Sequence, residues 1–136
     1  MGTGMKLKEV EFFMDKSVVS AAFAVMRQAL EVFKNRKENL YRAVGGRTGK
    51  TLQEVMMGGI HFRPREDDDG NIIDLDFEGE YTDNLHAIAF AAIAPFVKPG
   101  SFIEAFDDEC NYWRWVFTPT GVTEIKPTFV WPEVPV

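Results

Sequence analysis

The stretch "SFIEAFDDECNYWRWVF", Ser101–Phe117, decides the fold of this chain. Alternation in its second half places Trp113, Trp115 and Phe117 on the same face of an extended strand. Three large rings on one strand face need cover from other elements in a small domain. We therefore expect a strand whose tryptophan face packs against helices, with Arg114 on the opposite face.

Neighbouring segments extend this strand into a sheet. Ser101–Phe106 precedes it and Val122–Pro127 follows it, and the connections "DDECN" and "TPTG" have the lengths of hairpin loops. We expect Arg114 to pair with an acid on an adjacent strand, because side chains at facing positions of a sheet interact. The pattern thus predicts a three-stranded meander in this part of the chain.

A second hairpin is expected before the meander. The segments "GIHFRP" and "IIDLDFEGE" flank the turn "EDDDGNI", in which Asp69 and Gly70 form a strong hairpin signal. Ile73, Leu75 and Phe77 alternate with acidic residues. This alternation predicts one buried face and one acidic face in contact with water.

Helical spacing of apolar residues predicts two longer helices. One covers Lys16–Arg36, with Asp15 as its N-cap, and the other starts at Thr82 or Asp83 and ends at Pro95. The apolar stripe of the first helix consists of Val19, Ala22, Phe23, Met26, Leu30 and Phe33.

The stretch "AVGGRTGKT", Ala43–Thr51, looks like a phosphate-binding loop, but a turn between two helices explains it better. A phosphate loop needs a glycine where Val44 stands, and it follows a buried strand, whereas "NRKENLYRA" is polar. We expect "ENLYRAV" to form a short helix that the following glycine pair ends. Thr51 and Glu54 have the spacing of a capping box for the next helix, which we expect to stop at Gly58–Gly59.

The two ends of the chain give weaker patterns. Lys6–Phe13 fits both a strand and a helix, and we favour a helix. Residues 1–5 are expected to be a cloning remnant or disordered. Residues 127–136 are expected to form an extended tail, which Phe129 and Trp131 pin to the body or to a second copy.

Composition indicates one folded domain. The chain has 136 residues, of which 46% are hydrophobic, and no apolar run reaches the ~18 residues of a membrane span. The single cysteine, Cys110, excludes an intramolecular disulfide and favours a reducing, cytoplasmic location. The order of elements predicts one α+β domain over residues 1–136, with N-terminal helices packed on an antiparallel sheet of about five strands and one inserted helix.

The net charge of −6 is unevenly distributed along the chain. Residues 61–110 contain thirteen acidic and three basic residues, whereas residues 1–60 contain six acidic and ten basic residues. A concentrated acidic segment repels nucleic acid and attracts basic surfaces. We therefore expect a protein partner rather than direct binding to nucleic acid or to a membrane.

Patterns for metal or catalytic chemistry are weak. Arg65–Asp76 aligns with a calcium loop around Gly70, but arginine stands at the first ligand position, so at most a loose surface calcium site remains as an alternative. His61 falls in an expected strand and His86 on the polar side of a helix, without another ligand type at metal-like spacing. We expect no metal, no cofactor and no catalytic residue.

The run "IAPFVKPGSFIEAFDDECNYWRWVF", which starts at Ile93, resembles a block found in small uncharacterised bacterial and phage proteins. That block reads Ile-Ala-Pro-x-Val, Gly-Ser-x-Ile-Glu, an acidic turn and Trp-Arg-Trp-x-Phe. "GNIIDLDFEGE" is similar to what precedes it, so the match covers roughly Gly59–Lys126. This chain departs at "FDDECN", where the block has a glycine-containing turn. The resemblance implies the sheet and a bacterial or mobile-element origin, and it implies no activity.

Three functions remain open, and we favour the first. It is a non-enzymatic interaction domain, monomeric or homodimeric, that binds a protein through an acidic surface. The second is an acidic mimic of nucleic acid that inhibits a DNA- or RNA-binding protein. The third is a small-molecule binder or enzyme with an aromatic pocket between helices and sheet. The expected interaction surface consists of Asp67, Asp68, Asp69, Asp74, Asp76, Glu78, Glu80, Glu104 and Arg114.

Overall fold

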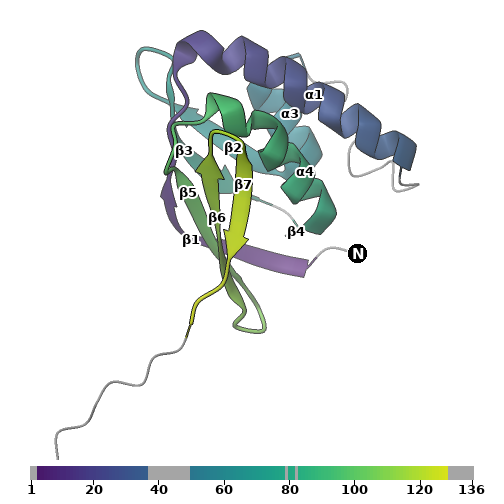
Figure 1. Ribbon diagram of the computed structural model, residues 1–136, viewed down its shortest axis with the longest axis vertical. Helices are drawn as coiled ribbons and strands as arrows, with labels where there is room; N and C mark the ends of the chain where they lie inside the picture. The colour runs from purple at the N-terminus through teal and green to yellow at the C-terminus, as the bar shows by residue number, and fades with distance from the viewer. Residues whose placement is uncertain (1–2, 37–49, 79, 82, 129–136) are drawn as a thin grey trace, which may run out of the picture.

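The computed structural model describes residues 3–36, 50–78, 80–81 and 83–128 (Figure 1). It confirms an α+β fold in which helices lie on one face of an antiparallel sheet (Figure 1). None of the described helices is long and apolar enough to span a membrane. The predictions of a helix over "ENLYRAV" and of a pinned tail with Phe129 and Trp131 lie outside the described residues.

Within the described residues, the main sheet has five antiparallel strands in the order β4-β1-β5-β6-β7. In chain order the strands are β1 (Thr3–Glu11), β4 (Glu80–Tyr81), β5 (Phe102–Asp107), β6 (Tyr112–Thr118) and β7 (Gly121–Ile125). The predicted meander is therefore correct. Its register aligns Ile103, Trp115 and Glu124 across β5, β6 and β7.

The first element is a strand, which corrects two predictions. Lys6–Phe13 does not form a helix, because most of it belongs to β1. Residues 3–5 belong to the same strand rather than to a disordered leader, and Met5 pairs with Asp107 of β5. The spacing of apolar residues in this segment fitted both a helix and a strand. Pairing with a strand about a hundred residues away decides in favour of the strand.

A separate two-stranded sheet is formed by β2 (Phe62–Glu66) and β3 (Ile72–Phe77). An isolated bridge joins this hairpin to the chain after β1. The amide nitrogens of Met14 and Ile72 each donate to the other's carbonyl oxygen at 2.9 Å. The hairpin thereby lies beside β1 without extending the main sheet.

A bulge in the hairpin corrects the expected facing of β3. Leu75 is buried and Phe77 is half-buried as expected, but Ile73 is 46% exposed. The pairing register shifts directly after Arg65, so that Ile72 turns inward in place of Ile73.

The described helices are α1 (Val19–Arg36) after the 3-10 turn η1 (Lys16–Val18), α3 (Leu52–Ile60), and α4 (Asp83–Ile93) before the 3-10 turn η3 (Ala94–Phe96). The predicted caps at Asp15 and Thr51 are confirmed. The Asp15 carboxylate accepts a hydrogen bond from the Ser17 amide at 2.8 Å. The Thr51 hydroxyl accepts one from the Glu54 amide at 3.2 Å, as the capping-box spacing predicted.

Helix α3 runs through Gly58–Gly59, which we expected to end it. The helix continues to Ile60, which is fully buried, and His61 closes it in the left-handed region with a φ of 61°. His61 is thus a helix cap and does not lie in a strand. Burial of Ile60 outweighs the helix penalty of about 1 kcal/mol for each glycine.

The core lies between the helices and the main sheet. Trp113, Trp115 and Phe117 are 7%, 1% and 0% exposed, which confirms that the tryptophan face is covered. Phe90 of α4 packs edge-on against Trp115 and Phe117, with ring centroids 5.0 and 5.7 Å away. The helix-facing side of β6 is therefore filled with side chains.

Candidate functional site

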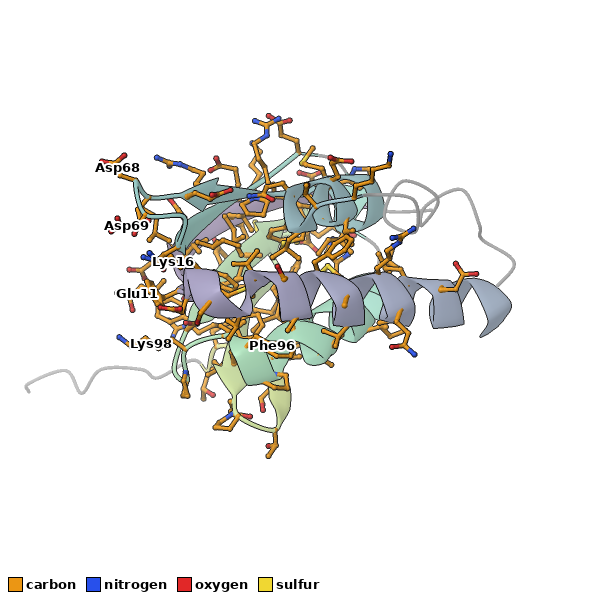
Figure 2. All side chains as sticks on the ribbon, turned by 90° about the horizontal axis from the view of Figure 1, so that it is seen from above. Glu11, Lys16, Asp68, Asp69, Phe96 and Lys98 are labelled. Atoms are coloured by element: carbon orange, nitrogen blue, oxygen red, sulfur yellow. The ribbon has the colours of Figure 1, made fainter. Side chains whose placement is uncertain are left out.

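The expected interaction residues are spread over several elements. They lie in the β2–β3 turn, along and just after β3, on β4, and on β5 and β6, in this order: Asp67, Asp68 and Asp69; Asp74, Asp76 and Glu78; Glu80; Glu104 and Arg114. Figure 2 shows Asp68 and Asp69 at one end of the molecule, which also carries Glu11, Lys16 and Lys98. Cations therefore lie among the acids even at the hairpin tip.

Two arginines of β2 lie beside the acids of β3. Arg63 Nη2 donates to Glu78 Oε2 at 2.7 Å, and Arg65 Nη1 donates to Asp74 Oδ2 at 3.2 Å. These side chains are 38–59% exposed, so each pair contributes only about 0–1 kcal/mol to stability. The pairs nevertheless turn an acidic row into a mixed-charge surface, which the count of acids along the sequence did not reveal.

The hairpin tip is held by its own hydrogen bonds. Asp67 Oδ1 accepts from the amides of Asp69 at 2.9 Å and Asn71 at 3.0 Å, and Oδ2 accepts from Asn71 Nδ2 at 3.0 Å. These bonds, above all the one from the Asn71 side chain, hold the pKa of Asp67 below its ordinary value. Asp67 thus serves the turn, while Asp68 points into solvent (Figure 2).

The β5–β6 turn repeats this arrangement. Asp107 Oδ1 accepts from the amides of Glu109 and Asn111, both at 2.9 Å, and Oδ2 accepts from Asn111 Nδ2 at 2.9 Å. The Asn111 side chain is again the main cause that lowers the pKa of Asp107. Cys110, which is exposed, occupies the place that Gly70 has in the first turn.

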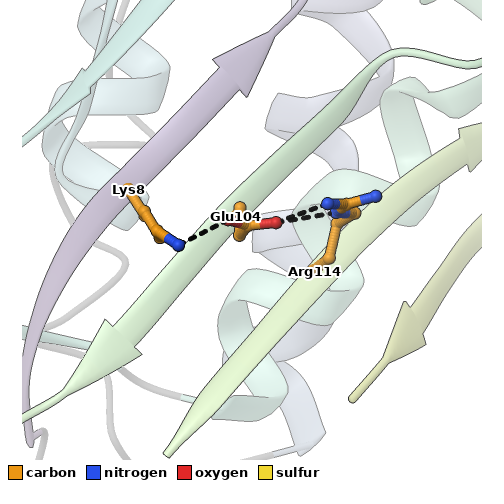
Figure 3. A network of polar contacts seen from close by, with 3 residues as sticks. All are labelled: Lys8, Glu104 and Arg114. Carbon is orange, nitrogen blue, oxygen red and sulfur yellow. Dashed lines mark hydrogen bonds and ion pairs between the residues drawn. The ribbon is translucent and has the colours of Figure 1, made fainter. Parts of the chain in front are cut away.

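The face of the main sheet turned away from the helices has an aromatic and aliphatic centre. This face, termed the open face, carries Phe102, Glu104, Phe106, Tyr112, Arg114, Val116, Thr123 and Ile125. Tyr112 and Ile125 are 41% and 44% exposed, and Phe102, Phe106 and Val116 are half-buried. Figure 3 views this face, with helices behind the sheet.

An ionic network crosses the centre of the open face (Figure 3). Arg114 donates through Nε and Nη2 to Glu104 Oε2, at 3.0 and 2.5 Å, and Lys8 Nζ lies 3.8 Å from Oε1. This confirms that Arg114 pairs with an acid on an adjacent strand. The Glu104 side chain is only 16% exposed, and charge-assisted bonds in such a place are stronger than those on the surface. The Arg114 guanidinium also covers the Phe102 ring, 4.5 Å from its centroid.

A hollow of about 660 Å³ opens beside this network, where β6 starts and β7 ends. Its lining includes the network residues Lys8, Glu104 and Arg114, together with Tyr112, Ile125 and Lys126. The Tyr112 ring is stacked on Phe106 with centroids 5.4 Å apart, which holds one wall of the hollow in place. The hollow combines a rigid aromatic wall with an excess of positive charge.

His86 lies in the core, which corrects its expected position on a polar helix face. It is fully buried, and its Nε2 lies 2.9 Å from the carbonyl oxygen of Ile60, to which it donates. Its ring is stacked against Trp115 and edge-on to Phe62, with centroids 6.4 and 5.7 Å away. The space between helices and sheet, where the third alternative function placed an aromatic pocket, is thus packed with rings.

Within the described residues, no three His, Cys, Asp or Glu side chains lie together in a way that would hold a metal ion. In the loop compared with a calcium site, Arg65 pairs with Asp74, and Asp67 is occupied by its own turn.

The open face was missed at first, although the sequence contains its signal. Phe102, Glu104 and Phe106 alternate with Ile103 and Ala105, which are fully buried. Such alternation with apolar residues on both sides is typical of a strand whose outer face is also partly apolar.

Comparison with known proteins adds no relative. No family model, no curated protein and no solved structure matches this chain. The resemblance to bacterial and phage proteins therefore stays a prediction, and function has to be argued from the surface of the molecule.

Proposed function

We propose that this protein is a non-enzymatic interaction domain that binds a protein partner through the open face of its main sheet. The observation that carries the proposal is the gathering of Tyr112 and Ile125, 41% and 44% exposed, beside three half-buried apolar side chains on one sheet face. Apolar side chains that adjoin one another on a surface mark interaction sites, whereas scattered ones do not. The partner is thus a protein, as expected from the sequence, but it binds the main sheet and not the acidic hairpin.

The ionic network supports this assignment. Tyrosine and arginine are enriched in protein interfaces, because they combine a large contact area with directed hydrogen bonds. Tyr112 and Arg114 stand two residues apart on one strand face, and Glu104 fixes the arginine through two hydrogen bonds. A charge held in fixed geometry within an apolar face selects among partners by complementarity.

The two alternatives have less support. A nucleic-acid mimic needs a continuous row of carboxylates, whereas Arg63 and Arg65 pair with two of the acids at β3. A small-molecule pocket between helices and sheet would need space that His86 and Trp115 fill.

A photo-crosslinking amino acid placed at position 125 or position 73 tests the proposal in cells. Ile73 is the matched control, since it is 46% exposed against 44% for Ile125 but lies on the hairpin. We expect crosslinks from position 125 to a defined protein, or to a second copy of this chain, and none from position 73. Crosslinks from position 73 alone, equal crosslinks from both positions, or none from either would contradict the proposal.

A further inference from the structure

We propose that the hollow on the open face receives acidic side chains from an extended segment of the partner, an inference that rests on the proposed function. Among the described residues, the hollow is lined by three cationic side chains, Lys8, Arg114 and Lys126, and by one carboxylate, Glu104, although the chain has a net charge of −6. A local excess of positive charge attracts negative groups. Charge complementarity therefore selects an acidic occupant.

Glu104 balances these cations only in part. It takes two of the five N–H donors of the Arg114 guanidinium, and Lys8 stands 3.8 Å away. The side chains of Lys8 and Arg114 are 59% and 39% exposed, so both can reach a second carboxylate while they keep the first.

The apolar lining indicates a protein segment rather than a free anion. A volume of about 660 Å³ has room for several side chains, and the Tyr112 ring and Ile125 offer them apolar contacts. Ile125 ends β7, which is an edge strand of the main sheet. An extended segment can lie along such an edge and place alternate side chains in the hollow.

A single-stranded nucleic acid fits this face less well. Exposed aromatic rings on a sheet can stack on bases, but Phe106 is already stacked on Tyr112, and Phe102 is covered by Arg114. The net charge of −6 also opposes a phosphate backbone. The occupant is therefore an acidic segment of a protein.

Amide chemical shifts test this with a defined probe. The capped peptide acetyl-Glu-Val-Glu-Phe-Glu-amide is titrated into the isotope-labelled protein, and the same peptide with Gln in place of Glu is the neutral control. We expect shifts at Tyr112, Arg114 and Lys126 with the acidic peptide only, and a severalfold weaker affinity when salt rises from ~0.05 to ~0.3 M. Equal shifts with the neutral peptide, or none at the hollow up to millimolar peptide, overturn the proposal.

Charge reversal gives an independent comparison. The double variant Lys8→Glu/Lys126→Glu changes the hollow, and Lys16→Glu/Lys98→Glu makes the same change in net charge at the end of the molecule that carries Asp68 and Asp69 (Figure 2). We expect the acidic peptide to bind the hollow variant about tenfold more weakly and the control variant less than about twofold more weakly. Equal losses in both variants would mean that overall charge, not the hollow, controls binding.

Failure of this inference can be told apart from failure of the proposed function. If crosslinking from position 125 identifies a partner while acidic and neutral peptides behave alike, the open face binds by apolar contact and only the inference falls. If free glutamate at equal carboxylate concentration produces the shifts of the acidic peptide, the hollow recognises a lone carboxylate, and the proposal of a segment is overturned.

Discussion

Among single residues, the two acidic turns show how one geometry is built with different side chains. In each turn an aspartate accepts hydrogen bonds from an asparagine four residues later. The residue before the asparagine is in the left-handed region, with φ of 93° at Gly70 and 63° at Cys110. A residue with a Cβ is strained there by about 1–2 kcal/mol, and glycine is not.

We expect Cys110→Gly to stabilise the fold by about 0.5–1 kcal/mol, because relief of strain exceeds the extra conformational entropy of glycine in the unfolded chain. Gly70→Ala is the reciprocal variant and is expected to lower the free energy of unfolding by a similar amount. Urea unfolding of the three proteins measures both changes. A Cys110→Gly protein no more stable than the wild type would contradict the strain at this turn.

The same turns predict a dependence of stability on pH. Asparagine side chains lower the pKa values of Asp67 and Asp107 in the folded chain. The ionised carboxylates therefore stabilise the fold above their unfolded pKa of about 3.9, and this contribution is lost as the pH falls through the lower folded values. We expect the urea midpoint of the wild type to decrease as the pH drops below about 4. The decrease should be smaller in Asp67→Asn/Asp107→Asn, which lacks both carboxylates. Asp68→Asn, at an exposed position of the first turn, should show the same decrease as the wild type. A double variant whose midpoint decreases as much as that of the wild type would contradict the role of Asp67 and Asp107.

Among the helices and strands, sequence patterns correctly predicted the features that depend only on residues close together in the chain. The caps at Asp15 and Thr51 and the hairpin at Gly70 were correct, because each needs only a few adjacent side chains. β1 was missed because its pairing partner is remote, as the contact of Met5 with Asp107 shows. The exposure of Ile73 was missed because a bulge has no clear signature in sequence.

In the candidate site, too, contacts between residues far apart in the sequence could not be predicted. That Arg114 pairs with an acid followed from alternation along one strand, but the identity of Glu104 required the register of β5 against β6. The arginines that neutralise the hairpin acids lie nine and fifteen residues before their partners, Asp74 and Glu78, and only the strand pairing brings them together.

The junction of α3 and α4 gives a prediction about packing. His86 joins the two helices by donating from Nε2 to the Ile60 carbonyl oxygen at 2.9 Å. We expect His86→Phe to lower the free energy of unfolding by about 1–3 kcal/mol, because it keeps the ring but leaves a buried carbonyl without this donor. Asn tolerates the left-handed conformation of the cap, so His61→Asn should change stability by less than about 0.5 kcal/mol. Denaturant unfolding compares the two, and a neutral His86→Phe would show that this bond contributes nothing.

For the whole molecule, the main sheet has two faces of different character. On one face, Trp115 and Phe117 of β6 are buried beneath the helices. The other face keeps apolar side chains half-buried around an ionic pair. Half-buried apolar side chains beside a fixed ionic pair are suited to a surface that another protein covers.

The central claim is that a partner binds this open face, and affinity capture with matched variants tests it most directly. Immobilised wild type, Tyr112→Ser/Ile125→Ser and Ile73→Ser are compared by the amount of each bound protein. We predict a partner that wild type and Ile73→Ser retain equally and that the double variant retains at least about tenfold less, since a few buried anchors, tyrosine among them, carry most of the binding energy of an interface. A partner that the double variant retains in full, or that Ile73→Ser alone loses, would contradict the account.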